Sequence, residues 1–186
     1  MLEEIRVIVF RYLLPILMVF VGLYLARKTD LLKDQSTSSE KPYSFSRSQL
    51  LWWTLIILCC FSIYYGTVGE IQKINKSSLI LLGISLGTTT AARVIDSTEV
   101  SNNIPRHQDR LDKKGFMYNI LSDENGISIH RFQAVVFNLI FGLIFIMKFA
   151  SNGIFEAFGE WELGLMGISS AAYVGLKVSE NRESKT

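Results

Sequence analysis

The chain has 186 residues, of which 49% are hydrophobic, and a formal net charge of +2 at pH 7. Soluble domains reach an apolar share of about half only when glycine is counted, so this chain is more apolar than an ordinary soluble domain. The small net charge gives no support for a nucleic-acid partner. Cys59 and Cys60 are adjacent, and His107 and His130 lack ligand spacing. The sequence therefore suggests no disulfide framework, no metal site and no cofactor.

The apolar residues are concentrated in blocks that are long enough to span a bilayer, which requires about 20 residues. The sequence therefore predicts an all-α polytopic membrane protein with five transmembrane helices, one N-terminal and four in two hairpins. The expected spans are 7–25, 50–68, 78–95, 133–150 and 161–178. The expected domains are an N-terminal helix (1–26), a linker (27–49), a first hairpin (50–95), a loop (96–132), a second hairpin (133–178) and a tail (179–186).

The first apolar block is the least regular of the five because it contains Arg11 and Pro15. An arginine one turn from the start can snorkel to the headgroups, and proline can kink a membrane helix without forbidding it. A cleaved signal peptide is the alternative. Against it, the leading residues include Glu3 and Glu4 and are not basic, and the apolar stretch is longer than a usual signal core.

Basic residues are distributed unevenly between the two sides of the expected helices. Fourteen of the 19 Lys and Arg residues fall in segments on one side. The positive-inside rule then places the N-terminus outside and the C-terminus in the cytoplasm. Trp52 and Trp53 near the inner end of the second span, and Trp161 near the outer end of the fifth, are expected at the membrane interfaces.

The sequence matches itself without a gap when it is shifted by 84 residues. Thirteen identities relate 44–96 to 128–180, and they include Arg47 with Arg131 and a shared Gly-Ile-Ser. Each repeat runs outward and returns, so the two hairpins are expected to be parallel repeats about an axis along the membrane normal. Inverted repeats would have favoured a secondary transporter.

The return helices carry small residues at every fourth position, which places them on one helix face. Small residues let helix backbones approach closely in a membrane. We expect these ladders to pack between repeats or protomers, or, alternatively, to form a sliding seam. The positions are Gly83, Gly87 and Ala91 in the first repeat, and Gly167, Ala171 and Gly175 in the second.

Polar residues inside the expected spans are candidates for a pore lining. Ser85, Thr88 and Thr89 form a hydroxyl stripe in the third span, and Asn138 is a carboxamide well inside the fourth. The hydroxyls could line a watery path, or they could bond back to carbonyls one turn earlier. Asn138 could serve a filter, or it could hydrogen-bond a neighbouring helix.

Both hairpins begin with the pattern S-x-x-R-x-Q, starting at Ser44 and at Ser128. The two serines are expected to cap their helices. The free amides of the helix starts, together with Arg47 and Arg131, could bind the phosphate of a lipid; simple snorkelling is the alternative for the two arginines.

The stretch 96–127 is too short for a catalytic domain, and it contains no calcium-loop or phosphate-loop pattern. Within it, 111–121 combines aromatic and aliphatic residues with two lysines and could form a short interfacial helix.

The S-x-x-R-x-Q and L-x-G-I-S hairpins, with the phrase 121–126 leading into His130-Arg131-Phe132-Gln133, resemble a group of uncharacterised bacterial membrane proteins. The resemblance covers about 40–180, implies a location in the bacterial inner membrane and carries no activity.

The expected function is an oligomeric, non-catalytic channel or membrane-permeabilising effector. The alternative is a membrane anchor or scaffold that presents 96–132 to a cytoplasmic partner complex. An intramembrane enzyme or transporter is disfavoured because the spans contain no cluster of His, Asp or Glu for acid–base work. The expected partners are the bilayer, further copies of the chain and a cytoplasmic protein.

Overall fold

The structure is a computed structural model, and it describes all residues except 39, 105, 110–114, 124, 156 and 182–186. It is mainly helical, as expected. One continuous N-terminal helix consists of α1 (Leu2–Arg6), the π-helical η1 (Val7–Leu13) and α2 (Leu14–Lys28). The other long helices are α3 (Phe45–Val68), α4 (Lys76–Ser101), α6 (Ile129–Asn152) and α7 (Glu160–Ser179). The short elements are η2 (His107–Asp109), α5 (Phe116–Leu121), β1 (Ser122–Asp123) and β2 (Gly126–Ile127).

Within the described part of the chain, four helices are long and apolar enough to cross a membrane: the N-terminal helix, α3, α4 and α6. The chain therefore has the character of a membrane protein. The fifth expected span lies in α7, which is helical but is not among these four candidates. Glu162, Lys177 and several glycines and serines make α7 less apolar than the other helices.

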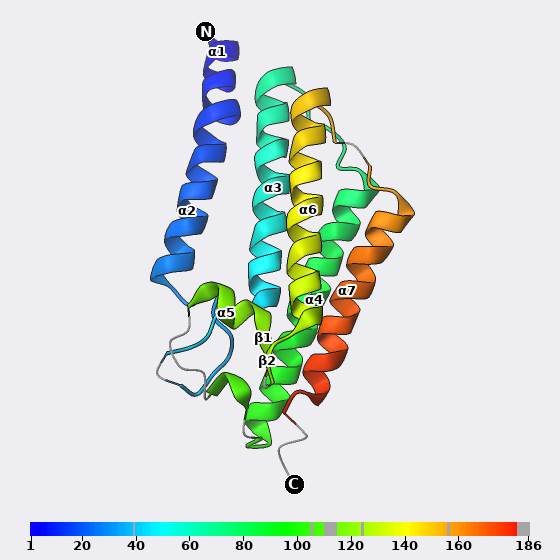
Figure 1. Cartoon of the computed structure of the whole chain (residues 1–186). Helices are drawn as coiled ribbons and strands as arrows, with labels where there is room; N and C mark the ends of the chain where they lie inside the picture. Colours follow the sequence, from blue (N-terminus) through cyan, green and yellow to red (C-terminus); the bar gives the residue numbers. More distant parts are fainter. Residues whose placement is uncertain (39, 105, 110–114, 124, 156, 182–186) are drawn as a thin grey trace.

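The long helices run roughly along one axis, with the start of α1 and the end of α7 at opposite ends of the molecule (Figure 1). α3 packs on the N-terminal helix, on α4 and on α6, and α7 packs on both α4 and α6. The helix starts keep the 84-residue offset, with α3 and α6 starting at Phe45 and Ile129. Both helices have 24 residues and end at a left-handed glycine, Gly69 or Gly153. Glycine suits such an end because it adopts positive φ without steric cost.

The half of the bundle nearer the N-terminus has an aromatic core. Phe155 and Phe158, from the connection between α6 and α7, fold back into the bundle beside Phe145, with the rings of Phe145 and Phe158 stacked 5.8 Å apart. Ser77 and Asn75 at the start of α4 hold this connection by donating hydrogen bonds to its carbonyls. The core of this half is therefore mainly aromatic, with Ser77 and Ser78 buried beside it.

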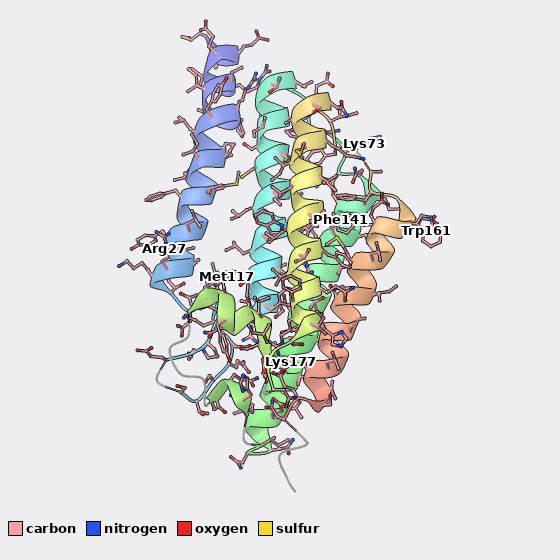
Figure 2. The ribbon with its side chains drawn as sticks, viewed as in Figure 1. Arg27, Lys73, Met117, Phe141, Trp161 and Lys177 are labelled. Carbon is pink, nitrogen blue, oxygen red and sulfur yellow. The ribbon has the colours of Figure 1, made fainter. Side chains whose placement is uncertain are left out.

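Trp53 is not the interfacial anchor that the sequence predicts. Its side chain is fully buried in the core, and its Nε1 donates to Asn138 Oδ1 at 2.7 Å. Trp161 is 87% exposed and projects outward from α7, as an interfacial tryptophan would (Figure 2).

The expected caps and the interfacial helix also need correction. Ser44 and Ser128 occupy the N-cap positions of α3 and α6, but neither side chain makes a capping hydrogen bond. Ser44 Oγ lies instead 3.2 Å from Ser46 Oγ. The helix expected at 111–121 is present only as α5, Phe116–Leu121, and 111–114 lie outside the described residues.

The π-helical turn before Pro15 leaves one carbonyl without a backbone donor. A π-helix bonds each amide to the carbonyl five residues earlier, and the Leu14 amide does so with Val9. The next bond would join Pro15 to the Phe10 carbonyl, but proline has no N–H to donate. Ser62 of α3 supplies the missing donor, with its Oγ 2.6 Å from the Phe10 oxygen. This hydrogen bond ties the N-terminal helix to α3.

Candidate functional site

A buried ion cluster lies at the end of the bundle where the chain ends, beneath the loops that connect the helices. Its centre is Lys177, near the lower end of the molecule in Figure 2. The Nζ atom lies 3.1 Å from Asp34 Oδ2 and 3.1 Å from Asp96 Oδ2. The side chains of Lys177 and Asp96 are each only 1% exposed. One ammonium thus joins α7, α4 and the loop that follows α2.

The described residues of 29–44 and 102–128 surround this cluster, and we name them the charged cap. Arg106, whose side chain is 1% exposed, donates two hydrogen bonds to Asp109, at 3.1 and 3.0 Å. Asp109 also accepts from Ser36 Oγ at 2.9 Å and from the Thr37 amide at 2.8 Å. Because Ser36 and Thr37 belong to one loop and Asp109 to the other, these bonds hold the two loops of the charged cap together.

A second ion pair fastens the start of α6 to the end of α7. Arg131 Nη2 lies 2.9 and 2.7 Å from the two carboxylate oxygens of Glu180. The same guanidinium lies 5.3 Å from the centre of the Tyr173 ring, within the range of a cation–π interaction. Nearby, Asn181 donates to Glu99 and accepts from the His107 amide at 2.8 Å. The α7 end is therefore joined to α4 and to the charged cap.

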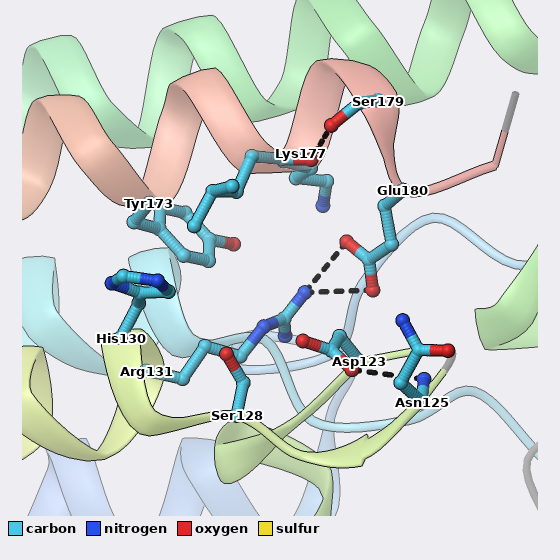
Figure 3. Close-up of a pocket in the computed structure, with 10 residues that line it drawn as sticks. Asp123, Asn125, Ser128, His130, Arg131, Tyr173, Lys177, Ser179 and Glu180 are labelled. Atoms are coloured by element: carbon cyan, nitrogen blue, oxygen red, sulfur yellow. Dashed lines mark hydrogen bonds and ion pairs between the residues drawn. The ribbon is translucent and has the colours of Figure 1, made fainter. Parts of the chain in front are cut away.

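A polar pocket of about 220 Å³ lies beside these pairs (Figure 3). The hydrogen-bonded pair Arg131 and Glu180 lines it, and His130 lies beside Tyr173. Asp123 and Asn125 of the β1–β2 turn close the opposite side. Two acidic residues, Asp123 and Glu180, and two basic residues, Arg131 and Lys177, line the pocket, so its formal charges are balanced.

The surroundings of the acidic groups shift their pKa values in both directions. Burial opposes ionisation of Asp109, but hydrogen bonds from Arg106, Thr37 and Ser36 outweigh it and lower its pKa below the ordinary 3.8. Burial also opposes ionisation of Asp34, yet the Lys177 ammonium lowers the pKa of Asp34. Burial of Glu180 has the opposite result, because it raises the pKa of that carboxyl despite the nearby Arg131. The cluster is therefore sensitive to acid at several points.

The ion pairs of this site connect segments of the chain. Among the described residues, no group of three His, Cys, Asp or Glu side chains could hold a metal ion. Lys177, Arg131 and Arg106 are each ion-paired with a carboxylate. Charged groups held in this way fix segments of chain relative to one another, because separating a buried pair leaves an uncompensated charge.

The expected glycine ladders face outward from the chain. A Cβ atom added at Gly83, Gly87 or Gly175 would meet no described atom within 4 Å, and at Gly167 it would meet only Ile84, at 4.0 Å. Ala171 is exposed and Ala91 is half-buried. The ladders are therefore not the contact between the two hairpins, and packing by them against another molecule remains a prediction.

The expected pore-lining hydroxyls lie inside the bundle of the single chain. Ser85 is fully buried and Thr88 is 5% exposed, and Thr89 donates to the Ser46 carbonyl of α3 at 3.0 Å. Thr88 and Thr89 also bond back to carbonyls four residues earlier, which confirms that alternative. A path lined by these hydroxyls would run within one chain and not between copies.

Asn138 and Arg47 have local partners. Asn138 is 7% exposed, and it accepts from Trp53 of α3 and donates to the Ala134 carbonyl. The alternative of a hydrogen bond between helices is thus confirmed. Arg47 donates to the Asp30 carbonyl at 3.2 Å. The structure does not bring Arg47 together with Arg131, and lipid binding by either stays a prediction.

Sequence reasoning missed the central role of Lys177, which it counted only as a charge flanking the last helix. The available signal was a lysine inside the final turn of a span, since such residues need a partner at the same depth. Asp96, at the corresponding level of the other return helix, was the partner to look for. Asp34, Arg106 and Asp109 gave no such signal because they lie outside the long helices.

Comparison with protein-family models, with curated proteins and with solved structures finds no match to this chain.

Proposed function

We propose that the protein is a non-catalytic membrane scaffold that holds the charged cap on the cytoplasmic side and presents it to a partner complex. The observation that carries the proposal is the junction at Lys177, where a loop and two helices meet at one buried ammonium. A surface that receives another protein is more effective when it is already ordered, because less conformational entropy is lost on binding. The ion pairs supply such order in the absence of a partner.

The shape of α4 supports the same proposal. The helix extends to Ser101, six residues beyond the expected end of its span at 95. Its last turns leave Val100 43% exposed beside the charged cap. The end of α4 around Val100 is held in place, since Asp96 and Glu99 of the same turns are buried in the cluster.

Site-specific photo-cross-linking in living cells tests this proposal. A photoreactive residue at Val100 should give a cross-link to one discrete protein, whereas the same residue at Leu143 is the matched control. Leu143 is 54% exposed in the middle of α6 and should contact only lipid. Asp34→Ala, which frees the loop from Lys177, should weaken the Val100 cross-link. The absence of a protein cross-link at Val100, or an equal one at Leu143, would contradict the scaffold.

The second candidate is the oligomeric channel or permeabilising effector. It is favoured by buried polar atoms in the half of the bundle near the charged cap: Gln49 Oε1 and Ser85 Oγ have no hydrogen-bond partner among the described residues. Water in this region would satisfy them. Potassium flux from vesicles containing the purified protein separates the candidates. A channel predicts flux that Ser85→Ala changes, whereas the scaffold predicts the leak of protein-free vesicles.

A further inference from the structure

A second cavity lies far from the ion cluster, on the membrane-facing side of the bundle. It is a groove of about 660 Å³ between the N-terminal helix, α3 and α6. Apolar side chains form most of its wall, among them Leu23, Leu55, Ile63 and Ile146. The N-terminal helix stands beside α3 in Figure 1, and the groove follows their line of contact. An apolar groove within the hydrocarbon region is suited to an apolar chain.

Two close approaches fix the width of the groove. At Gly66, an added Cβ would lie only 2.5 Å from the Arg11 amide nitrogen, so the two helices touch there through backbone. At Gly22, an added Cβ would lie 3.2 Å from the Leu55 side chain. The Ser62 hydrogen bond to Phe10 adds a third tie. The N-terminal helix is therefore held in place, and the groove persists beside it.

Two arginines lie at the end of the groove opposite the charged cap. Arg11 lines the groove there, and the Arg6 side chain lies against Gly69 at the end of α3. Arg6 Nε is buried without a hydrogen-bond partner, and neither arginine is ion-paired with a described residue. The π-helical turn matters here, because its extra residue per turn brings side chains five apart closer to one face than an α-helix would.

We propose that this groove binds one anionic glycerophospholipid, with an acyl chain along the groove and its phosphate at Arg6 and Arg11. The groove extends along α3 from Trp52 to Val68, which is about 24 Å at 1.5 Å per residue. That length exceeds half of the roughly 30 Å hydrocarbon core, so a chain from the leaflet opposite the charged cap fits within it. Guanidinium groups bind phosphate by paired, charge-assisted hydrogen bonds.

Native mass spectrometry of the full chain tests the proposal. The protein is reconstituted in vesicles of phosphatidylcholine and phosphatidylglycerol, extracted in mild detergent, and the retained lipids are counted. The parent protein should retain one phosphatidylglycerol. The double substitution Arg6→Gln with Arg11→Gln should weaken retention at least about fivefold, as expected when charge near the membrane surface is lost. The double substitution Arg27→Gln with Arg93→Gln is the charge-matched control, since both arginines are exposed and neither lines the groove.

A second pair of variants tests the apolar part of the site independently of charge. Ile146→Trp should fill the groove and expel the lipid, whereas Met147→Trp should not, because Met147 is 67% exposed and does not line the groove. Equal retention by both tryptophan variants, or by the double arginine variant and its control, would overturn the proposal. If Ile146→Trp abolished a dimer and left lipid retention unchanged, the proposal would also be overturned, because the groove would then bind a second copy of the chain.

Discussion

A lysine that is 1% exposed needs opposite charge around it, because an isolated ammonium in a low-dielectric interior loses hydration that nothing else replaces. Lys177 finds that charge in Asp34 and Asp96, which come from parts of the chain 143 and 81 residues away. A buried pair of this kind adds little net stability compared with apolar packing, but removing one partner is costly. Lys177 is therefore the residue on which the buried ion cluster depends.

Lys177→Met should destabilise the protein by about 3–5 kcal/mol, since it removes the ammonium that lies between the carboxylates of Asp34 and Asp96. Arg93→Met, at the position equivalent to Lys177 in the first repeat, should cost less than about 0.5 kcal/mol because Arg93 is exposed. Unfolding in mixed detergent measures both values. Equal stability of the two variants would show that the cluster is not a structural junction.

The acidic residues of the cluster predict loosening of the charged cap in acid. The pKa values of Asp109 and Asp34 are lowered, so their stabilisation is complete above the ordinary value of 3.8 and disappears as the pH falls through the lower folded values. Glu180 has a raised pKa, so its contribution has the opposite sign and partly offsets the loss. Hydrogen exchange of 29–44, corrected for its intrinsic pH dependence, should rise below about pH 3.8. In Asp109→Asn, fast exchange should already be present at pH 7.

Among the helices, the contact between the N-terminal helix and α3 compensates for the amide that is missing at Pro15. Pro15 removes one amide from the helix, and Ser62 of α3 replaces it at the Phe10 carbonyl. Membrane helices tolerate proline because serine and threonine of neighbouring helices can satisfy the freed carbonyl. Gly66 permits this approach, since a methyl group there would collide with the Arg11 backbone.

A double-mutant cycle tests the compensation between Pro15 and Ser62. Ser62→Ala should cost about 1 kcal/mol in the parent protein, because the Phe10 carbonyl then has no donor. In a Pro15→Ala background the same change should cost much less, because the substituted residue has a backbone amide that can donate to this carbonyl. Thermal unfolding of the four proteins gives the coupling energy. Equal costs of Ser62→Ala in both backgrounds would mean that Ser62 and Pro15 act independently.

Sequence patterns predicted the elements built from long apolar runs, and they failed where a contact decides the outcome. The hydropathy of α3 and α6 indicated both helices, but it could not show that Trp53 turns inward to meet Asn138. The small residues of α4 indicated a packing face, but the sequence left open whether it faces the same chain or another molecule. The ion cluster stayed hidden because Asp34 and Asp109 acquire their partners only through the path of the loops.

At the scale of the whole molecule, the interior is divided into an aromatic half and a polar half. The aromatic half surrounds Phe145 and Phe158, and the polar half contains Gln49, Ser85 and Ser170, with the ion cluster beneath it. The outward glycine ladders lie outside both halves. The chain thus keeps these polar groups within its own bundle, and packing of another molecule on the small-residue faces is a prediction.

Gly87→Leu should reduce self-association without changing the stability of the single chain. No described atom lies within 4 Å of a Cβ at Gly87, so a larger side chain finds space unless another copy packs there. Close backbone contact between copies would be lost, a cost of roughly 1–3 kcal/mol for overpacking. Ile80→Phe, off the ladder, is the control. The oligomer fraction in mild detergent is the measurement. If Gly87→Leu assembled like the parent protein, the small-residue ladder would not be a contact between copies.

We expect the chain to span the membrane and to hold the charged cap in the cytoplasm. Single cysteines at Ser101 and Ser151, in a background with Cys59 and Cys60 replaced by alanine, test it most directly. Both serines are exposed, and they lie at opposite ends of the bundle. In intact cells, an impermeant thiol reagent should label Ser151→Cys and leave Ser101→Cys unlabelled until the membrane is opened. Labelling of Ser101→Cys from outside, or of both cysteines equally, would contradict the account.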